Sequence, residues 1–92
     1  MTVRDNSDEL RYEIEEDGEV RGFIQYRRDD DGAITMVHTD VEPKWEGHGV
    51  GSALVQGALD DVRAHGLKVR PQCPFVAAYI RRHPEYEEIV QS

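Results

Sequence analysis

The N-terminal half of the chain alternates between apolar and polar side chains, with turn residues between the alternating runs. In residues 9–15, Leu, Tyr and Ile alternate with Arg and Glu, which is the period of a half-buried β-strand. The same period returns at about residues 20–27, after the turn pair Asp17-Gly18. We therefore expect a β-hairpin in this part of the chain.

A third run, residues 33–41, is rich in β-branched residues and carries apolar side chains on both faces. A strand of this kind is typical of the interior of a sheet, because both of its faces are covered. The run follows a turn at residues 29–32 and ends before Pro43, which has no amide to donate to a ladder.

After Pro43 the apolar positions change to helical spacing. They predict a helix from Val50 to His65 that is capped by Gly66. A short strand at Leu67–Arg70 and a second helix at Phe75–Arg82 are expected next, and the tail after Pro84 forms a last turn or frays. The apolar positions of the first helix are Val50, Leu54, Val55, Ala58, Leu59 and Val62.

The order β-β-β-α-β-α predicts an α/β (α+β) fold with a mostly antiparallel four-stranded sheet. The crossover helix returns the fourth strand beside the third. No repeat or linker interrupts residues 1–92, and a chain of this length holds one modest core. We therefore expect a single domain.

Composition narrows the classes of partner. The formal net charge of −8 argues against a broad nucleic-acid surface. No apolar run approaches the roughly 20 residues that cross a bilayer, and the N-terminus is polar and acidic. The single cysteine, Cys73, fits a reducing compartment. We expect a cytoplasmic protein with neither a nucleic-acid nor a membrane partner.

Glycines at positions 47, 49 and 51 stand directly before the first helix, in the stretch WEGHGVGSAL. The stretch has no lysine where a Walker loop requires one, and the expected antiparallel sheet disfavours a Rossmann fingerprint. Two interpretations stay open. The glycines form a flexible loop with a close helix contact, or they leave room for an anion on the free amides of the helix. A pyrophosphate is the natural occupant in the second case.

Residues 46–51, together with Val41-Glu42-Pro43, resemble the acetyl-coenzyme-A pyrophosphate loop of the GNAT N-acetyltransferase superfamily. Residues 38–41, 71–75 and 83–86 resemble a subfamily of short members, so the resemblance extends from about residue 9 to 87. It implies a GNAT-like sheet that is splayed between the third and fourth strands, with acetyl-coenzyme A in the splay. It also implies N-acetyl transfer to an amine that the sequence does not identify.

His83, His65 and the acidic clusters have no spacing typical of a metal site, so we expect acetyl-coenzyme A as the cofactor and no metal. Glu46 stands where arginine or glutamine is usual in the family, so we expect its side chain to point away from the pyrophosphate and the main chain to bind it. In relatives a tyrosine protonates the departing thiolate, a role that Tyr79 matches loosely, and core packing is its alternative. The expected cofactor-binding residues are Thr39, Asp40, Val41, Gly47, His48, Gly49, Val50, Gly51, Ser52 and Tyr79.

Cys73 and His38 are the candidate catalytic residues. Cys73 follows the fourth strand, at an edge where ligands collect, and thioester exchange onto a cysteine is chemically easy. His38 is a candidate proton acceptor for it. The alternative is direct attack by the acceptor amine, with Cys73 lining the pocket and His38 structural. A coenzyme A-binding module without turnover also stays open, as does a monomer or a weak homodimer.

Overall fold

The alternating N-terminal half of the chain forms one sheet in the computed structural model, which describes residues 1–92. Strand order in the sheet follows chain order, with antiparallel pairs from β1 to β4 and a parallel pair between β4 and β5. The strands are β1 (Thr2–Asn6), β2 (Arg11–Glu16), β3 (Glu19–Arg28), β4 (Ile34–Val41) and β5 (Val69–Pro71).

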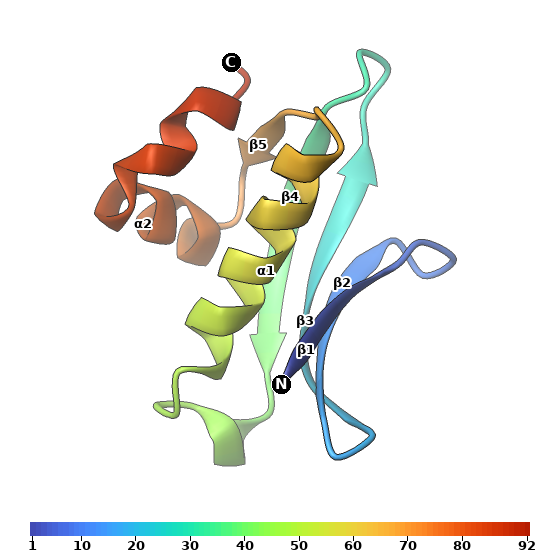
Figure 1. The fold of residues 1–92 in the computed structure, drawn as a ribbon, viewed down its shortest axis with the longest axis vertical. Helices are drawn as coiled ribbons and strands as arrows, with labels where there is room; N and C mark the ends of the chain where they lie inside the picture. The colour runs from blue at the N-terminus through green and yellow to red at the C-terminus, as the bar shows by residue number, and fades with distance from the viewer.

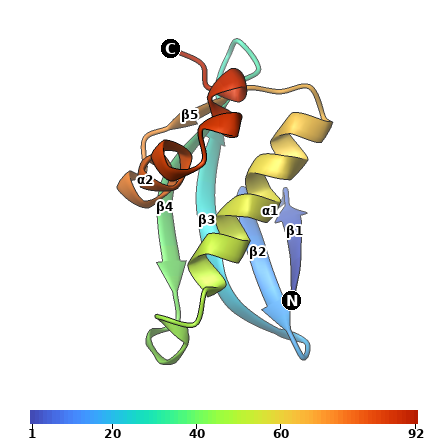
Figure 2. The ribbon, with the colours of Figure 1, turned by 60° about the vertical axis from the view of Figure 1, so that its left-hand side comes forward.

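Both α-helices lie on the same side of this sheet (Figures 1 and 2). The first, α1 (Val50–Ala64), crosses β1 to β4, and α2 (Pro74–Arg82) lies beside it near β4 and β5. Two 3₁₀ segments, η1 (Pro43–Trp45) and η2 (Pro84–Ile89), follow β4 and α2. The opposite face of the sheet carries no helix (Figure 2).

The core lies between the sheet and α1. The apolar stripe that the sequence predicts on α1 is buried in full, from Val50 to Val62. It packs against inward residues of the sheet, including Ile14, Ile24 and Met36, none of which is exposed. The helix ends as expected, because Gly66 adopts the left-handed conformation that closes a helical C-terminus.

The fold class is confirmed, and the strand count differs. The sequence predicts four strands, whereas β1 adds a fifth at the N-terminal edge. Its residues Thr2–Asn6 include only one inward apolar side chain, Val3, so alternation does not reveal it. Cross-strand contacts hold it instead, since Tyr26 donates to Asp5 at 2.6 Å and Arg4 pairs with Glu15 at 2.8 Å.

The third and fourth strands predicted from the sequence are β4 and β5 of the structure, because β1 was not predicted. The expected splay is present between them. Only Ile34–Met36 of β4 pair with β5, so the rest of β4 has a strand neighbour on the β3 side alone. The sequence placed this strand in the interior of the sheet, which holds for its first half. A bulge also falls in β4 at the point where the two strands separate.

The C-terminal tail is ordered by packing. It forms η2, buries Tyr86 and Ile89, and ends in a bridge between Val69 and Val90. Of the two alternatives for the tail, a last turn is therefore correct. None of the helices has the length and apolar content required to cross a membrane.

The close approach of α1 to β1 gives a test of the packing. A Cβ at Gly57 would lie 2.6 Å from the Cβ of Val3. Overpacking of this kind costs about 1 to 3 kcal/mol. That cost exceeds the gain of up to ~1 kcal/mol that alanine brings to a helix.

We therefore expect Gly57→Ala to lower the free energy of unfolding, measured by urea denaturation. The control is Gln56→Ala, because Gln56 is an exposed neighbour on the same helix. A Gly57→Ala protein that is as stable as the control would show that α1 does not press on β1.

Candidate functional site

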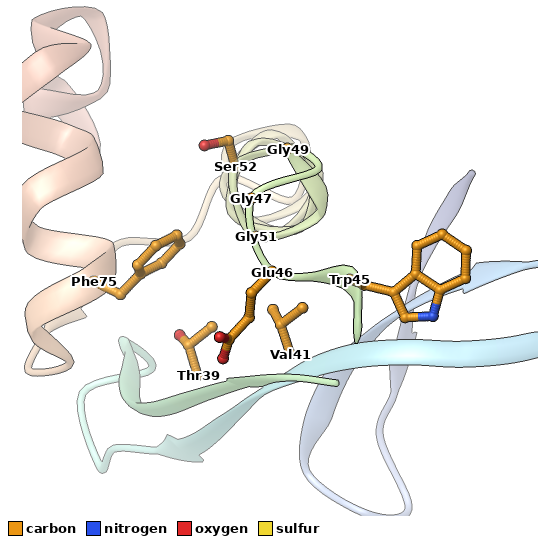
Figure 3. Close-up of a pocket in the computed structure, with 9 residues that line it drawn as sticks. All are labelled: Thr39, Val41, Trp45, Glu46, Gly47, Gly49, Gly51, Ser52 and Phe75. Atoms are coloured by element: carbon orange, nitrogen blue, oxygen red, sulfur yellow. The ribbon is translucent and has the colours of Figure 1, made fainter. Parts of the chain in front are cut away.

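The largest cavity of the structure lies where β4 and β5 separate, and it has a volume of about 410 Å³. Figure 3 shows β4 along one side, the glycine loop and first turn of α1 along the other, and Phe75 and Trp45 at opposite ends. We call it the β4–α1 cavity. Its lining residues are Thr39, Val41, Trp45, Glu46, Gly47, Gly49, Gly51, Ser52 and Phe75.

The glycine loop presents free backbone amides to this cavity. Gly47 and Gly49 have φ angles of 83° and 78°, a left-handed conformation that glycine adopts without strain. The first helical hydrogen bond runs from the amide of Ala53 to the carbonyl of Gly49. The amides without any acceptor in the protein are those of Gly47, Gly49, Val50, Gly51 and Ser52.

Within the glycine loop, not every residue predicted to bind the cofactor has a backbone amide that lacks an acceptor in the protein. The amide of His48 donates to the carbonyl of Trp45 at 3.2 Å, and the His48 ring lies edge-on to the Trp45 ring. The Val50 side chain is buried in the core, so only its amide remains for a ligand. The anion-binding capacity of the loop therefore resides in backbone groups that flank His48.

The exposed half of β4 forms the second side of the cavity. Thr39 and Val41 line it, whereas Asp40 lies between them on the opposite face of the strand. On the β5 side, the last hydrogen bond to β4 runs from the amide of Cys73 to the carbonyl of Met36, at 2.9 Å. Beyond Met36 this edge of β4 is open to an extended ligand.

Cys73 lies behind the cavity wall. Its side chain is only 4% exposed, and Sγ lies 3.3 Å from Oγ1 of Thr39. Since Thr39 lines the β4–α1 cavity and Cys73 does not, the hydroxyl stands between the thiol and the cavity. Cys73 also directly precedes α2, as the N-cap residue of that helix.

His38 is not brought to Cys73. In the antiparallel pair, His38 lies opposite Gln25, and its neighbour Thr39 lies opposite Ile24. Directly opposed residues share a face of the sheet, and Ile24 is in the core. His38 therefore lies on the face away from Thr39 and Cys73.

Tyr79 belongs to a cluster beside η2. It is 4% exposed and stacks on His83 with a centroid distance of 4.1 Å. Burial, together with the carboxylates of Asp60 and Glu85, raises the pKa of Tyr79, so the phenol keeps its proton at neutral pH. It does not line the β4–α1 cavity, and core packing is the role that its surroundings support.

Glu46 points away from the free amides, but it points into the cavity. Figure 3 shows its carboxylate directed across the space toward Thr39. The nearby Lys44 pairs with Glu42, at 3.8 Å, and no cation lies within ion-pair distance of Glu46. The cavity therefore carries one unpaired negative charge near Thr39.

Two aromatic residues of the cavity were not predicted from the sequence. Trp45 closes one end, where its ring stacks on the Arg21 guanidinium at 4.3 Å. Phe75 closes the other end and is 40% exposed; the sequence predicts it only as the first residue of the second helix. In the sequence, Trp45 stands directly before the glycine loop and Phe75 stands two residues after Cys73. These two positions were the available signals that the side chains belong to the site.

No group of three or more His, Cys, Asp or Glu side chains is arranged to hold a metal ion. The chemistry that the cavity offers is therefore that of backbone donors, one open strand edge, one carboxylate and a covered thiol.

Comparison with known proteins connects this geometry to a family. Residues 11–89 match the model of a family described as GCN5-related N-acetyl-transferase. The solution structure of a GCN5-like N-acetyltransferase candidate from Staphylococcus aureus is similar in fold, with a TM-score of 0.73 and 23% sequence identity. The alignment covers 99% of this chain and 88% of that one. Comparison with curated proteins found no match.

The position of Cys73 behind Thr39 predicts how the thiol reacts with an alkylating reagent. Iodoacetamide should modify Cys73 slowly in the native protein, because a thiol that is 4% exposed must wait for a local opening. Thr39→Ala removes the cover and should raise the rate several-fold, as followed by mass spectrometry. The control is Thr35→Ala, since Thr35 lies on β4 but outside the cavity. Equal rates in Thr39→Ala and the native protein would contradict this placement.

Proposed function

Because the chain belongs to the GCN5-related N-acetyl-transferase family, we propose that it transfers an acetyl group from acetyl-coenzyme A to an amine, with the cofactor bound in the β4–α1 cavity. The observation that carries this proposal is the set of free amides at the start of α1. A helix N-terminus gathers about half a positive charge and binds phosphate groups through such amides.

The diphosphate of the cofactor would rest on the amides of Gly47, Gly49, Val50, Gly51 and Ser52. The net charge of −8 repels a polyanion at long range, so short hydrogen bonds from fixed donors must supply the attraction. The left-handed glycines hold these donors in place before the ligand arrives, which lowers the ordering cost of binding.

The pantetheine arm would lie along the open edge of β4. It contains amide groups, and the backbone of Thr39 to Val41 lacks a strand partner on that side. An extended ligand that pairs with a free strand edge is a common mode of recognition. This path leads from the glycine loop toward the point where β4 and β5 separate.

The acetyl group would then lie near Thr39 and Cys73. The burial of Sγ favours direct attack by the amine on the thioester carbonyl. In that step an ammonium acceptor first gives one proton to solvent, and the neutral nitrogen then forms a bond to the carbonyl carbon and loses a second proton. The carbon–sulfur bond breaks, and the thiolate of coenzyme A leaves and is protonated. The covalent alternative passes the acetyl group through Cys73, which requires Thr39 to move aside first.

The acceptor is proposed to be cationic before it reacts. Glu46 places an unpaired carboxylate in the cavity, and the surface carries 19 acidic against 11 basic residues. Both features attract a protonated amine and steer it toward the site. His38 has no part in this proposal, because it lies on the opposite face of β4.

A second candidate function is a coenzyme A-binding module without turnover. Glu46 is the only titratable side chain that lines the cavity, so the site holds little acid–base machinery. Binding alone would then be the function, and acetylated product would not form.

Binding of coenzyme A tests the amide cradle. Gly49→Ala places a Cβ at a left-handed residue, which costs roughly 1 to 2 kcal/mol. If the loop must keep this conformation to bind, the Kd rises by about 5- to 30-fold in calorimetry. Gly32→Ala is the matched control, because Gly32 has a φ of 88° in a turn outside the cavity. An unchanged Kd in Gly49→Ala would remove the support for the cradle.

Turnover separates the candidate functions and routes. The native protein is incubated with acetyl-coenzyme A and, as probes, spermidine or a lysine peptide, and all species are followed by mass spectrometry. We expect acetylated amine from both the native protein and Cys73→Ser. One acetyl mass on the native protein, together with loss of product in Cys73→Ser, would establish the covalent route instead. Bound cofactor with no product from either probe would favour the binding module.

A further inference from the structure

The Phe75 ring lies beside the free amides at the start of α1 (Figure 3). A Cβ at Gly51 would lie 2.7 Å from Cζ of Phe75, so the tip of the ring rests on the backbone of the first helical turn. Gly51 does not have a positive φ, in contrast to Gly47 and Gly49, so it is the approach of the ring that requires a glycine there. Because the Gly51 amide belongs to the set proposed for the diphosphate, the ring borders the diphosphate site.

Phe75 has a ring surface that the protein leaves uncovered. The side chain is 40% exposed, and no other aromatic ring or cation stacks on it. Trp45, at the other end of the cavity, differs, because the Arg21 guanidinium lies over its ring at 4.3 Å. An exposed phenyl ring alone is ordinary, but one beside phosphate-binding amides is a surface on which a nucleotide base can stack.

The helix that carries Phe75 also carries a cation without an ion-pair partner. Ala78 and Arg82 follow Phe75 by three and seven residues, which places the three on one stripe of α2. Arg82 is exposed and enters no ion pair or side-chain hydrogen bond, whereas Glu85 and Glu88 pair with other side chains. Because Cα–Cβ bonds in a helix tilt toward its N-terminus, an arginine at position 82 reaches back toward Phe75.

Coenzyme A extends from its diphosphate in two directions, with the pantetheine arm on one phosphate and adenosine 3′-phosphate on the other. The open edge of β4 is proposed to hold the arm, so the adenosine leaves the amides on another side. Only the ribose separates the diphosphate from the base, which keeps the adenine within reach of side chains that border the amides. Phe75 is the side chain there with an uncovered ring, and Arg82 stands further along the same helix face.

We propose that Phe75 binds the adenine of the cofactor by stacking and that the 3′-phosphate faces Arg82. The inference rests on the proposed function, since it assumes coenzyme A in the β4–α1 cavity. Stacking of a base on an aromatic side chain changes a Kd by about 5- to 150-fold. The protein would then recognise the nucleotide part of the cofactor as well as its pantetheine arm.

The test of the stacking contact compares coenzyme A with 4′-phosphopantetheine, which keeps the arm and one phosphate but has no nucleotide. Phe75→Ala should raise the Kd of coenzyme A by about 5- to 150-fold and leave that of 4′-phosphopantetheine unchanged, as measured by NMR titration. In the native complex, the adenine H2 or H8 proton should give a nuclear Overhauser effect to the Phe75 ring.

Two further variants separate stacking from packing. Phe75→Leu keeps an apolar side chain near Gly51 but loses the flat ring, so it should also weaken coenzyme A alone. Leu67→Ala is the control, because Leu67 is similarly exposed, at 36%, and does not line this cavity. Thermal melting checks that each variant is folded.

Dephospho-coenzyme A, which has no 3′-phosphate, tests Arg82. The native protein should prefer coenzyme A by up to about fivefold, the range of an exposed ion pair. Arg82→Gln should lose this preference. Arg81→Gln is the matched control, since it removes the same charge from an exposed neighbour on a different face of α2, and it should keep the preference. A preference that Arg82→Gln retains would remove the 3′-phosphate from this face.

Coenzyme A binding to the native protein separates failure of the site from failure of the adenine contact. If coenzyme A does not bind, the proposed function fails and the inference fails with it. If it binds and Phe75→Ala weakens coenzyme A and 4′-phosphopantetheine equally, or weakens neither, only the adenine contact is overturned. A native complex without any adenine-to-Phe75 Overhauser effect would overturn it as well.

Discussion

The geometry of the whole site depends on backbone amides that have no acceptor within the protein. They exist because α1 begins abruptly after two left-handed glycines, Gly47 and Gly49, with no side chain to cap the helix. A helix start normally satisfies its first amides with a side-chain oxygen. Leaving them free costs stability unless water or a ligand takes that place, so an uncapped start beside a cavity indicates an anion site.

The fold holds these amides opposite an open strand edge. The apolar stripe of α1 is buried in full against the sheet, which fixes where the helix begins relative to β4. The early end of the β4–β5 pairing at Met36 then leaves the edge of β4 free. Phe75 and Trp45 close the two ends of the resulting cavity. The same separation of strands thus creates the cavity and exposes the backbone along its wall.

Patterns that repeat along the sequence were predicted correctly, and contacts between distant segments were not. The period of α1, the β2–β3 hairpin and the position of the glycine loop followed from local spacing. β1 was missed because its pairing depends on polar contacts across the sheet. The face that His38 occupies depends on strand register and a bulge, which single-sequence spacing does not determine. Local spacing gives Phe75 only as the start of a helix, and its place as a cavity wall depends on the approach of α1 from a distant part of the chain.

Amide chemical shifts during a titration with coenzyme A test the central claim most directly. In a ¹⁵N-labelled protein, the account predicts that the amides of Gly47, Gly49, Val50, Gly51 and Ser52 shift strongly as they begin to donate to the diphosphate. The amide of His48 already donates to Trp45 and should move less. Saturable binding whose largest shifts lie on other segments, with the glycine loop unchanged, would contradict the account.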